Sequence, residues 1–284
     1  HLYTGEEAVA ASVCAQLTDE DLIASTHRGH GHCIAKGAEL DRALAELMGK
    51  SDGYCKGRSG SMHIADFSKG NLGANAIVGG GIPIATGGAL ALKMQKKPNV
   101  AVAFFGDGAS NQGTFHESIN MAAVWKLPCV YVVENNQFGM TVPVWQSTSV
   151  EDISVRGAAY GIPGETVDGN DVVAVYEAFA RAKERALKGG GPSIIECKTY
   201  RWRGHWTGDP EVYRTREEVE DWKENRDPIK RFRDYLIKHK LASKKELDEI
   251  DQAAAKKMEA AVEFAMNSPE PDPAHVLDDV FYEG

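Results

Sequence analysis

The sequence predicts an α/β fold in which a parallel sheet is flanked by helices, with a C-terminal helical extension. Short apolar runs alternate with helical patterns in the middle of the chain, and glycine turns separate them. Charge is unevenly spread: residues 71–140 hold 7 charged side chains in 70, whereas residues 211–260 hold 26 in 50. The first stretch is expected in the interior and the second on solvated helices. We therefore predict a main domain at 1–210 and, packed on it, a helical extension at 211–284.

The first half of the chain is predicted to contain two buried strands. A helical pattern at 5–17 opens the sequence. Residues 100–105 read VAVAFF, an almost wholly apolar run that is typical of a strand buried on both faces. A glycine turn and a helical pattern at about 112–125 come next, and residues 129–134 (CVYVVE) read as the second buried strand.

The second half adds one more strand and several helices. A helical pattern at 172–187 and a glycine turn lead into a strand at 193–197. Strand–helix–strand units of this spacing form parallel sheets with right-handed crossovers. Charged helical patterns follow at 217–226, 228–239 and 243–266. Ser243 and Glu246 have the spacing of a capping box at the start of the last helix, and the proline-rich run at 268–273 ends it.

Composition argues against several classes of function. The formal net charge of -9 disfavours binding to nucleic-acid phosphates or to an anionic membrane surface. No apolar run approaches the roughly 20 residues that span a bilayer. The five cysteines are scattered and form no C-x-x-C pair, which favours a reducing compartment over a disulfide framework or a zinc site. The expected location is the cytoplasm.

Two polar side chains follow the two central strands at the point where each strand ends. Asp107 lies in the turn Gly106-Asp107-Gly108, and Asn136 follows the next strand. Ligands of parallel sheets bind at the carboxyl ends of the strands, where these two side chains are expected to meet. A carboxylate and an amide oxygen suit magnesium or calcium. The glycines allow a phosphate to approach, and a helix beginning near residue 111 directs free N–H groups at it, so the simplest predicted ligand is a magnesium diphosphate.

The turn and its distance from Asn136 resemble the thiamine diphosphate motif, in which Gly-Asp-Gly is followed after some 25–30 residues by Asn. Other segments extend the resemblance over nearly the whole chain: HLYTGEEA at 1–8, STHRGHG at 25–31, KGRSGSMHIAD at 56–66, NAIVGGGIP at 75–83, ENNQFGM at 134–140 and YRWRGHWTGDP at 200–210. Together they resemble the alpha subunits of the thiamine-dependent 2-oxo acid dehydrogenase and acetoin dehydrogenase family. The resemblance implies a thiamine diphosphate-binding fold over 1–210. It also leads us to expect some tens of residues before His1.

The resemblance assigns the metal and diphosphate contacts position by position. Asp107, the Asn136 side chain and the Phe138 backbone carbonyl are expected to hold Mg²⁺. Gly108 and Ala109 are expected to line the diphosphate.

Other positions are expected to contact the remainder of the cofactor. His27 and Arg28 stand where the family places its diphosphate clamp, a role that suits the bidentate fork of arginine. The backbone at Ala76 and Val78 is expected to meet the aminopyrimidine ring. Met140 is expected to form the apolar wedge beneath the cofactor.

His205 and His1 correspond to active-site histidines of the family and are expected to act as acid/base or electrostatic groups. His205 is also expected to bind the cofactor by touching its diphosphate. The family also implies an activating Glu, supplied by a separate beta subunit in an alpha2-beta2 assembly, and this chain offers no candidate for it. The purified chain alone is therefore expected to be nearly inactive. The expected acceptor of the product is a lipoyl group on an acyltransferase.

Two departures from the animal-type pyruvate dehydrogenase alpha subunits bear on substrate and regulation. The clamp reads His27-Arg28 in place of Tyr-Arg, and Trp206 follows His205 where those subunits carry a regulatory serine, which excludes phosphorylation there. The segment at 27–37 looks most like acetoin dehydrogenase alpha subunits. Oxidative cleavage of acetoin is therefore the predicted activity, with pyruvate decarboxylation as the alternative and branched-chain 2-oxo acids third.

Two other classes of function remain as alternatives. One is a non-catalytic assembly subunit, against which the presence of Asp107, Asn136, Arg28 and His205 argues. The other is a nicotinamide dehydrogenase. The glycine run at 79–88 does not complete a dinucleotide fingerprint, because Ile84 stands where the third glycine is required.

Overall fold

A six-stranded parallel sheet forms the centre of the computed structural model, which describes residues 1–278 and 280. The strand order is β2-β1-β3-β4-β8-β7. The strands are β1 (Leu22–Thr26), β2 (Asn71–Asn75), β3 (Ala101–Gly106), β4 (Cys129–Asn135), β7 (Gly164–Asp168) and β8 (Ser193–Lys198). Every pair of neighbours is parallel, which confirms the predicted fold class.

The apolar runs that predicted strands form the centre of this sheet. β3 and β4 pair residue by residue from Ala101 opposite Cys129 to Gly106 opposite Glu134. All seven residues of β4 are buried. β1 and β2 escaped prediction because they are short, and β2 (NLGAN) consists largely of residues that are depleted in strands.

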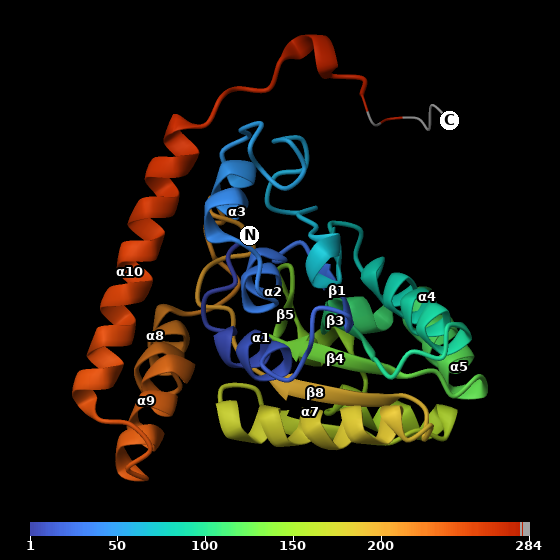
Figure 1. Cartoon of the computed structure of the whole chain (residues 1–284). Coiled ribbons are helices and arrows are strands. Elements are labelled where there is room, and N and C mark those ends of the chain that lie inside the picture. Colours follow the sequence, from blue (N-terminus) through green and yellow to red (C-terminus); the bar gives the residue numbers. More distant parts are fainter. Residues whose placement is uncertain (279, 281–284) are drawn as a thin grey trace.

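Helices cover both faces of the sheet, as Figure 1 shows. α4 (Gly81–Met94) and α5 (Gly113–Val124) pack on one face, and α1 (Glu7–Cys14) and α7 (Val172–Leu187) pack on the other. Successive residues of β3 serve the two layers in turn: Ala101, Ala103 and Phe105 face α4 and α5, whereas Val102 and Phe104 face α1 and α7. This two-sided burial explains why the strand sequence is apolar throughout.

The turn after β3 differs in detail from the prediction. Residues Gly108–Asn111 form a short 3-10 helix, η2, and the extended residue Gln112 separates it from α5. The helix expected near residue 111 therefore begins at Gly113. The backbone beside Asp107 is a 3-10 turn rather than the first turn of that helix.

The remaining helices lie around this core. They are α2 (His30–Ala35), α3 (Leu40–Leu47), α6 (Val144–Ser147), α8 (Arg216–Asn225), α9 (Pro228–Lys238) and α10 (Lys244–Asn267), with 3-10 turns η1 (Phe67–Lys69), η3 (Ile153–Tyr160) and η4 (Pro273–His275). A two-residue hairpin pairs β5 (Phe138–Gly139) with β6 (Val142–Pro143).

The three charged helices predicted near the C-terminus are confirmed as α8, α9 and α10. The capping box of Ser243 and Glu246 is present at the start of α10. α10 packs against α3 and runs along the outer side of the molecule, beside α8 and α9 (Figure 1). The division at residue 210 remains a prediction. Within residues 1–278 and 280, no helix combines the length and apolarity that crossing a membrane requires.

Candidate active site

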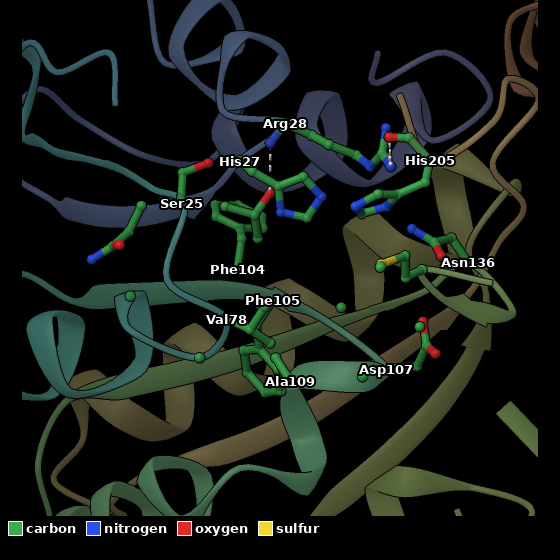
Figure 2. A pocket seen from close by; sticks show the side chains of 18 of the residues that line it. Ser25, His27, Arg28, Val78, Phe104, Phe105, Asp107, Ala109, Asn136 and His205 are labelled. Atoms are coloured by element: carbon green, nitrogen blue, oxygen red, sulfur yellow. Dashed lines mark hydrogen bonds between the residues drawn. The ribbon is translucent and has the colours of Figure 1, made fainter. Parts of the chain in front are cut away.

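A cavity of about 310 Å³ lies at the carboxyl ends of β1, β3 and β4. The segments that line it are the end of β1, the loop before α4, the turn between β3 and η2, the segment after β4 and the loop at 201–205. Figure 2 shows Asn136 near Asp107 on one side of this cavity and the rings of His27 and His205 close together. The cavity therefore occupies the position that parallel sheets use for ligands.

Most residues predicted for the site line this cavity: His27, Arg28, Val78, Asp107, Gly108, Ala109, Asn136, Phe138, Met140 and His205. Ala76 lies outside the lining but between Asn75 and Ile77, which both contribute to it. His1 also lies outside the lining, and its ring packs against the rings of His27 and His205.

Asp107 and Asn136 are buried, at 1% and 7% exposure, yet each retains one unused oxygen. Oδ2 of Asp107 and Oδ1 of Asn136 have no hydrogen-bond partner among the described residues; we call such buried polar atoms open atoms. Burial raises the pKa of Asp107 to about 6. Burying an acceptor without a hydrogen-bond partner costs free energy unless a cation or a donor binds it. A carboxylate oxygen beside an amide oxygen is a donor set that fits Mg²⁺.

Arg201 occupies the side of the cavity next to these oxygens and was missed in the sequence. Its guanidinium is fully buried and donates from Nη2 to the Met140 carbonyl at 2.8 Å and from Nη1 to the Phe138 carbonyl at 3.5 Å. A carbonyl oxygen has two lone pairs, so the long bond from Arg201 leaves Phe138 able to bind a metal. Arg201 and Arg203 both stand in the quoted loop sequence, and no spacing distinguishes which of them turns inward.

Two glycines bring two backbone segments together beside Asp107. A Cβ on Gly108 would lie 3.2 Å from the Cα of Gly139, and a Cβ on Gly139 would lie 3.4 Å from the Cα of Gly108. Larger residues would push the segments apart. Met140 follows with φ of 59°, a left-handed conformation, and its side chain is half exposed in the cavity lining.

Three histidine rings meet at the edge of the cavity. The ring centroids of His1 lie 4.8 Å from those of both His27 and His205, and one nitrogen of each ring lies within 4.8 Å of the others. His1 Nδ1 lies 2.7 Å from the His205 carbonyl, and since a carbonyl only accepts, Nδ1 donates the hydrogen bond. Burial lowers the pKa of His27 to about 3 and that of His205 to about 4. The rings of His27 and His205 are therefore neutral at physiological pH and able to accept a proton.

Arg28 connects the first residues of the chain to the loop at 201–205, the His205 loop, through hydrogen bonds. Its guanidinium donates from Nη1 to the Leu2 carbonyl and from Nη2 to the His205 carbonyl at 2.9 Å. Burial lowers its pKa to about 10, so it remains a cation. Two of its five N–H groups are used in this way, and the expected diphosphate contact would use others.

The His205 loop is held by Asp209. This carboxylate accepts from the His205 N–H at 2.6 Å, from the Glu211 N–H at 2.9 Å and from the Tyr213 hydroxyl at 2.8 Å. Arg201 also donates to the Tyr213 hydroxyl, at 2.9 Å. The loop is thus ordered by contacts within the chain itself.

A buried polar network beneath the cavity was not predicted. Glu134 accepts from the Tyr3 hydroxyl and contacts His32 Nε2 at 2.9 Å, and His32 Nδ1 lies 2.8 Å from Ser25 Oγ. Glu6 lies beside this group, fully buried, and its pKa is raised to about 8 by burial and by the charge of Glu134. Its Oε1 accepts from Nδ2 of Asn136 at 3.1 Å, and its Oε2 is an open atom.

The sequence is similar over nearly its whole length to known proteins. The model of the family described as "Dehydrogenase E1 component" matches residues 1–274. The chain is 54% identical over 281 residues to the alpha subunit of acetoin:2,6-dichlorophenolindophenol oxidoreductase from Bacillus subtilis, covering 99% of this chain and 84% of that protein. The corresponding subunit from Cupriavidus necator is 48% identical over the same shares of both chains. The pyruvate dehydrogenase E1 component subunit alpha of Porphyra purpurea is 43% identical, over 96% of this chain and 81% of the relative.

Proposed function

The chain belongs to the dehydrogenase E1 component family, and on that basis we propose that it is the alpha subunit of a thiamine diphosphate-dependent enzyme that cleaves acetoin oxidatively. The two acetoin-enzyme subunits, at 54% and 48% identity, are more similar to it than the pyruvate dehydrogenase subunit at 43%. The observation that carries the proposal is the cavity itself. It places the open oxygens of Asp107 and Asn136 in one small space with His27 and His205.

The residues present fit the cofactor. We assign Mg²⁺ to Asp107, Asn136 and the Phe138 carbonyl, because the two side-chain oxygens are open and hard. Gly108 and Ala109 would line the diphosphate.

The remaining lining would hold the organic part of the cofactor and its charge. Arg28 and His27 would clamp the diphosphate, the backbone at Ala76 and Val78 would meet the aminopyrimidine ring, and Met140 would support the cofactor from below. Bound thiamine diphosphate supplies a nucleophilic carbon and an electron sink for breaking a bond next to a carbonyl group.

The neutral His205 ring can serve the cleavage of acetoin. Cleavage of acetoin between its carbonyl and carbinol carbons releases acetaldehyde only after the carbinol hydroxyl loses its proton. Loss of CO2 from pyruvate needs no such base. His205 is a neutral acceptor in the cavity lining, so it can take this proton and return it later.

A beta subunit completes the proposal. Among the lining residues that the structure describes, Asp107 is the single carboxylate, and the metal would use it. The carboxyl group that activates thiamine diphosphate would therefore come from a second chain, as the term "subunit alpha" in the relatives' names suggests. Ile77, Val78 and Met140 are more than half exposed where they line the cavity, and an adjoining subunit would cover them. We propose an alpha2-beta2 enzyme that passes its C2 unit to a lipoyl group of an acyltransferase.

Dye reduction by the co-expressed alpha–beta pair tests the proposal. Acetoin, pyruvate and a branched-chain 2-oxo acid would each be supplied with and without Mg-thiamine diphosphate. We expect cofactor-dependent reduction with acetoin. Cofactor-dependent reduction with pyruvate but not with acetoin would support the alternative, a pyruvate dehydrogenase alpha subunit. A stable pair that binds no cofactor would support a non-catalytic assembly subunit.

A further inference from the structure

We propose that Glu6 is a positioning residue that orients the side-chain amide of Asn136, so that its carbonyl oxygen and not its NH2 group faces the metal. The inference rests on the proposed cofactor site, because it concerns how this chain prepares one of the ligands. It adds to that site a residue that is not itself part of the cavity lining and does not enter the ligand set.

The two ends of a side-chain amide differ in the hydrogen bonds that they form. One end accepts hydrogen bonds and the other donates them, and only the accepting end can bind a cation. In Asn136, Nδ2 donates to Oε1 of Glu6 at 3.1 Å, which leaves Oδ1 as the open atom on the other side of the group. A rotation of the amide by half a turn would set two acceptors, Oδ1 and Oε1, against each other and present N–H groups to Mg²⁺.

The preceding residue, Asn135, provides an internal comparison. Its Nδ2 donates to Oε1 of Glu196 at 2.7 Å, and its Oδ1 accepts from the Gln137 N–H at 3.2 Å. Both ends of that amide are satisfied by the protein, so it is structural. At Asn136 a buried glutamate satisfies the donor end only.

Glu6 is a costly residue for the interior to hold. It is fully buried beside Glu134, and its Oε2 is an open atom. Burying a carboxyl group with one oxygen left without a hydrogen-bond partner is unfavourable, and an apolar residue of similar volume commonly stabilises such a position. Its side chain accepts a hydrogen bond from Asn136, and orienting that amide is the benefit that would offset the cost of burial.

The test uses the chain co-expressed with its beta subunit, with Mn²⁺ in place of Mg²⁺ and thiamine diphosphate present. Free Mn²⁺ is measured by electron paramagnetic resonance, and the melting temperature of the metal-free complex is measured in parallel. Glu6→Leu removes the acceptor at similar volume, and Glu6→Gln keeps an acceptor oxygen. Glu196→Leu makes the same change at the glutamate that holds Asn135.

We expect Glu6→Leu to weaken Mn²⁺ binding about 10- to 100-fold, the usual effect of losing a group that orients a metal ligand. Its melting temperature should be unchanged or higher, since a buried carboxyl group with an unpaired oxygen is gone. Glu6→Gln should stay close to the wild type in Mn²⁺ affinity. Glu196→Leu should lower the melting temperature without weakening Mn²⁺ binding. If Glu6→Leu does not assemble, Glu6→Met takes its place.

A double-mutant cycle separates orientation from general loosening of the site. In an Asn136→Asp background there is no amide to orient, so Glu6→Leu should no longer weaken Mn²⁺ binding. Equal losses with Asn and with Asp at 136, or equal losses in Glu6→Leu and Glu196→Leu, would overturn the inference. A wild-type complex that binds no Mn²⁺ with thiamine diphosphate would instead overturn the proposed function on which it rests.

Discussion

Buried carboxylates in this protein fall into two groups according to whether their oxygens are satisfied. Asp21 is buried, and its oxygens accept from the Thr18 and Val100 N–H groups at 2.9 Å and from Lys183 Nζ at 3.1 Å. Asp107 is equally buried but keeps an open oxygen. The first arrangement stabilises the fold, and the second is available to a ligand.

This contrast predicts opposite effects of the same substitution. Asp107→Asn should weaken Mg-thiamine diphosphate binding by more than about 100-fold, beyond the loss typical of groups that only support a ligand. It should leave the stability of the cofactor-free protein unchanged, because a neutral amide is easier to bury. Asp21→Asn should cost about 1–3 kcal/mol of unfolding free energy and leave cofactor affinity unchanged. Calorimetric titration and urea unfolding measure the two quantities; a parallel loss in both variants would contradict the contrast.

The buried histidines predict acid sensitivity. Burial lowers the pKa of His27 to about 3 and that of His30 to about 4, whereas both titrate near about 6.5 in an unfolded chain. Below pH of about 6.5 the unfolded chain protonates these two residues and the folded chain does not, so their contribution to the unfolding free energy falls as pH drops toward 4. Urea unfolding at pH 7.5, 6 and 5 should show this loss. His27→Gln should make the dependence shallower, and an unchanged slope would show that His27 does not contribute.

At this scale the spacing of residues revealed what adjoins a recognisable strand, and the resemblance to known alpha subunits supplied most of the other predicted residues that line the cavity. Asp107 and Asn136 could be found because each follows an apolar run. Glu6 lies 130 positions from Asn136, and Tyr3 lies 131 positions from Glu134, so no local spacing connects either pair. Their contacts arise only when the sheet brings α1 beside the end of β4.

The loop at 200–215 is held in place by a few polar contacts. Asp209 holds the His205 N–H and the Tyr213 hydroxyl, and Arg203 is exposed within the same loop. Asp209→Ala should therefore accelerate trypsin cleavage after Arg203 and raise the KM for substrate, since His205 loses its fixed position. Asp221→Ala, on the surface of α8, is the matched control. Equal cleavage rates in the two variants would show that Asp209 does not order the loop.

β3, β4 and β8 could be predicted because each contains consecutive apolar residues that helices cover on both faces. β1 is also buried on both faces, but it is short and was not predicted. β2 lies at the sheet edge with glycine and asparagine in its sequence, and β7 lies at the other edge with little burial. At these edges the neighbouring strand, and not the local sequence, determines the conformation.

The molecule as a whole presents a cavity that, on the proposed function, a second subunit would complete. The cavity opens among exposed apolar side chains, and its described lining contains one carboxylate, which the metal would use. The chain alone should therefore bind Mg-thiamine diphosphate weakly and reduce dye with acetoin at no more than a trace rate. Addition of the separately purified beta subunit should restore turnover in proportion to complex formed. Full turnover by the chain alone would contradict this prediction.

Trp206 is also an intrinsic fluorescent probe of the loop that carries His205. Its indole is 54% exposed, directly after the histidine at the cavity edge, in a loop tied to Arg28 and Asp209. Tryptophan emission shifts with the polarity around the ring, so loop closure over a ligand can be followed by stopped-flow fluorescence without an attached dye. A Trp206→Phe variant supplies the background from the other four tryptophans.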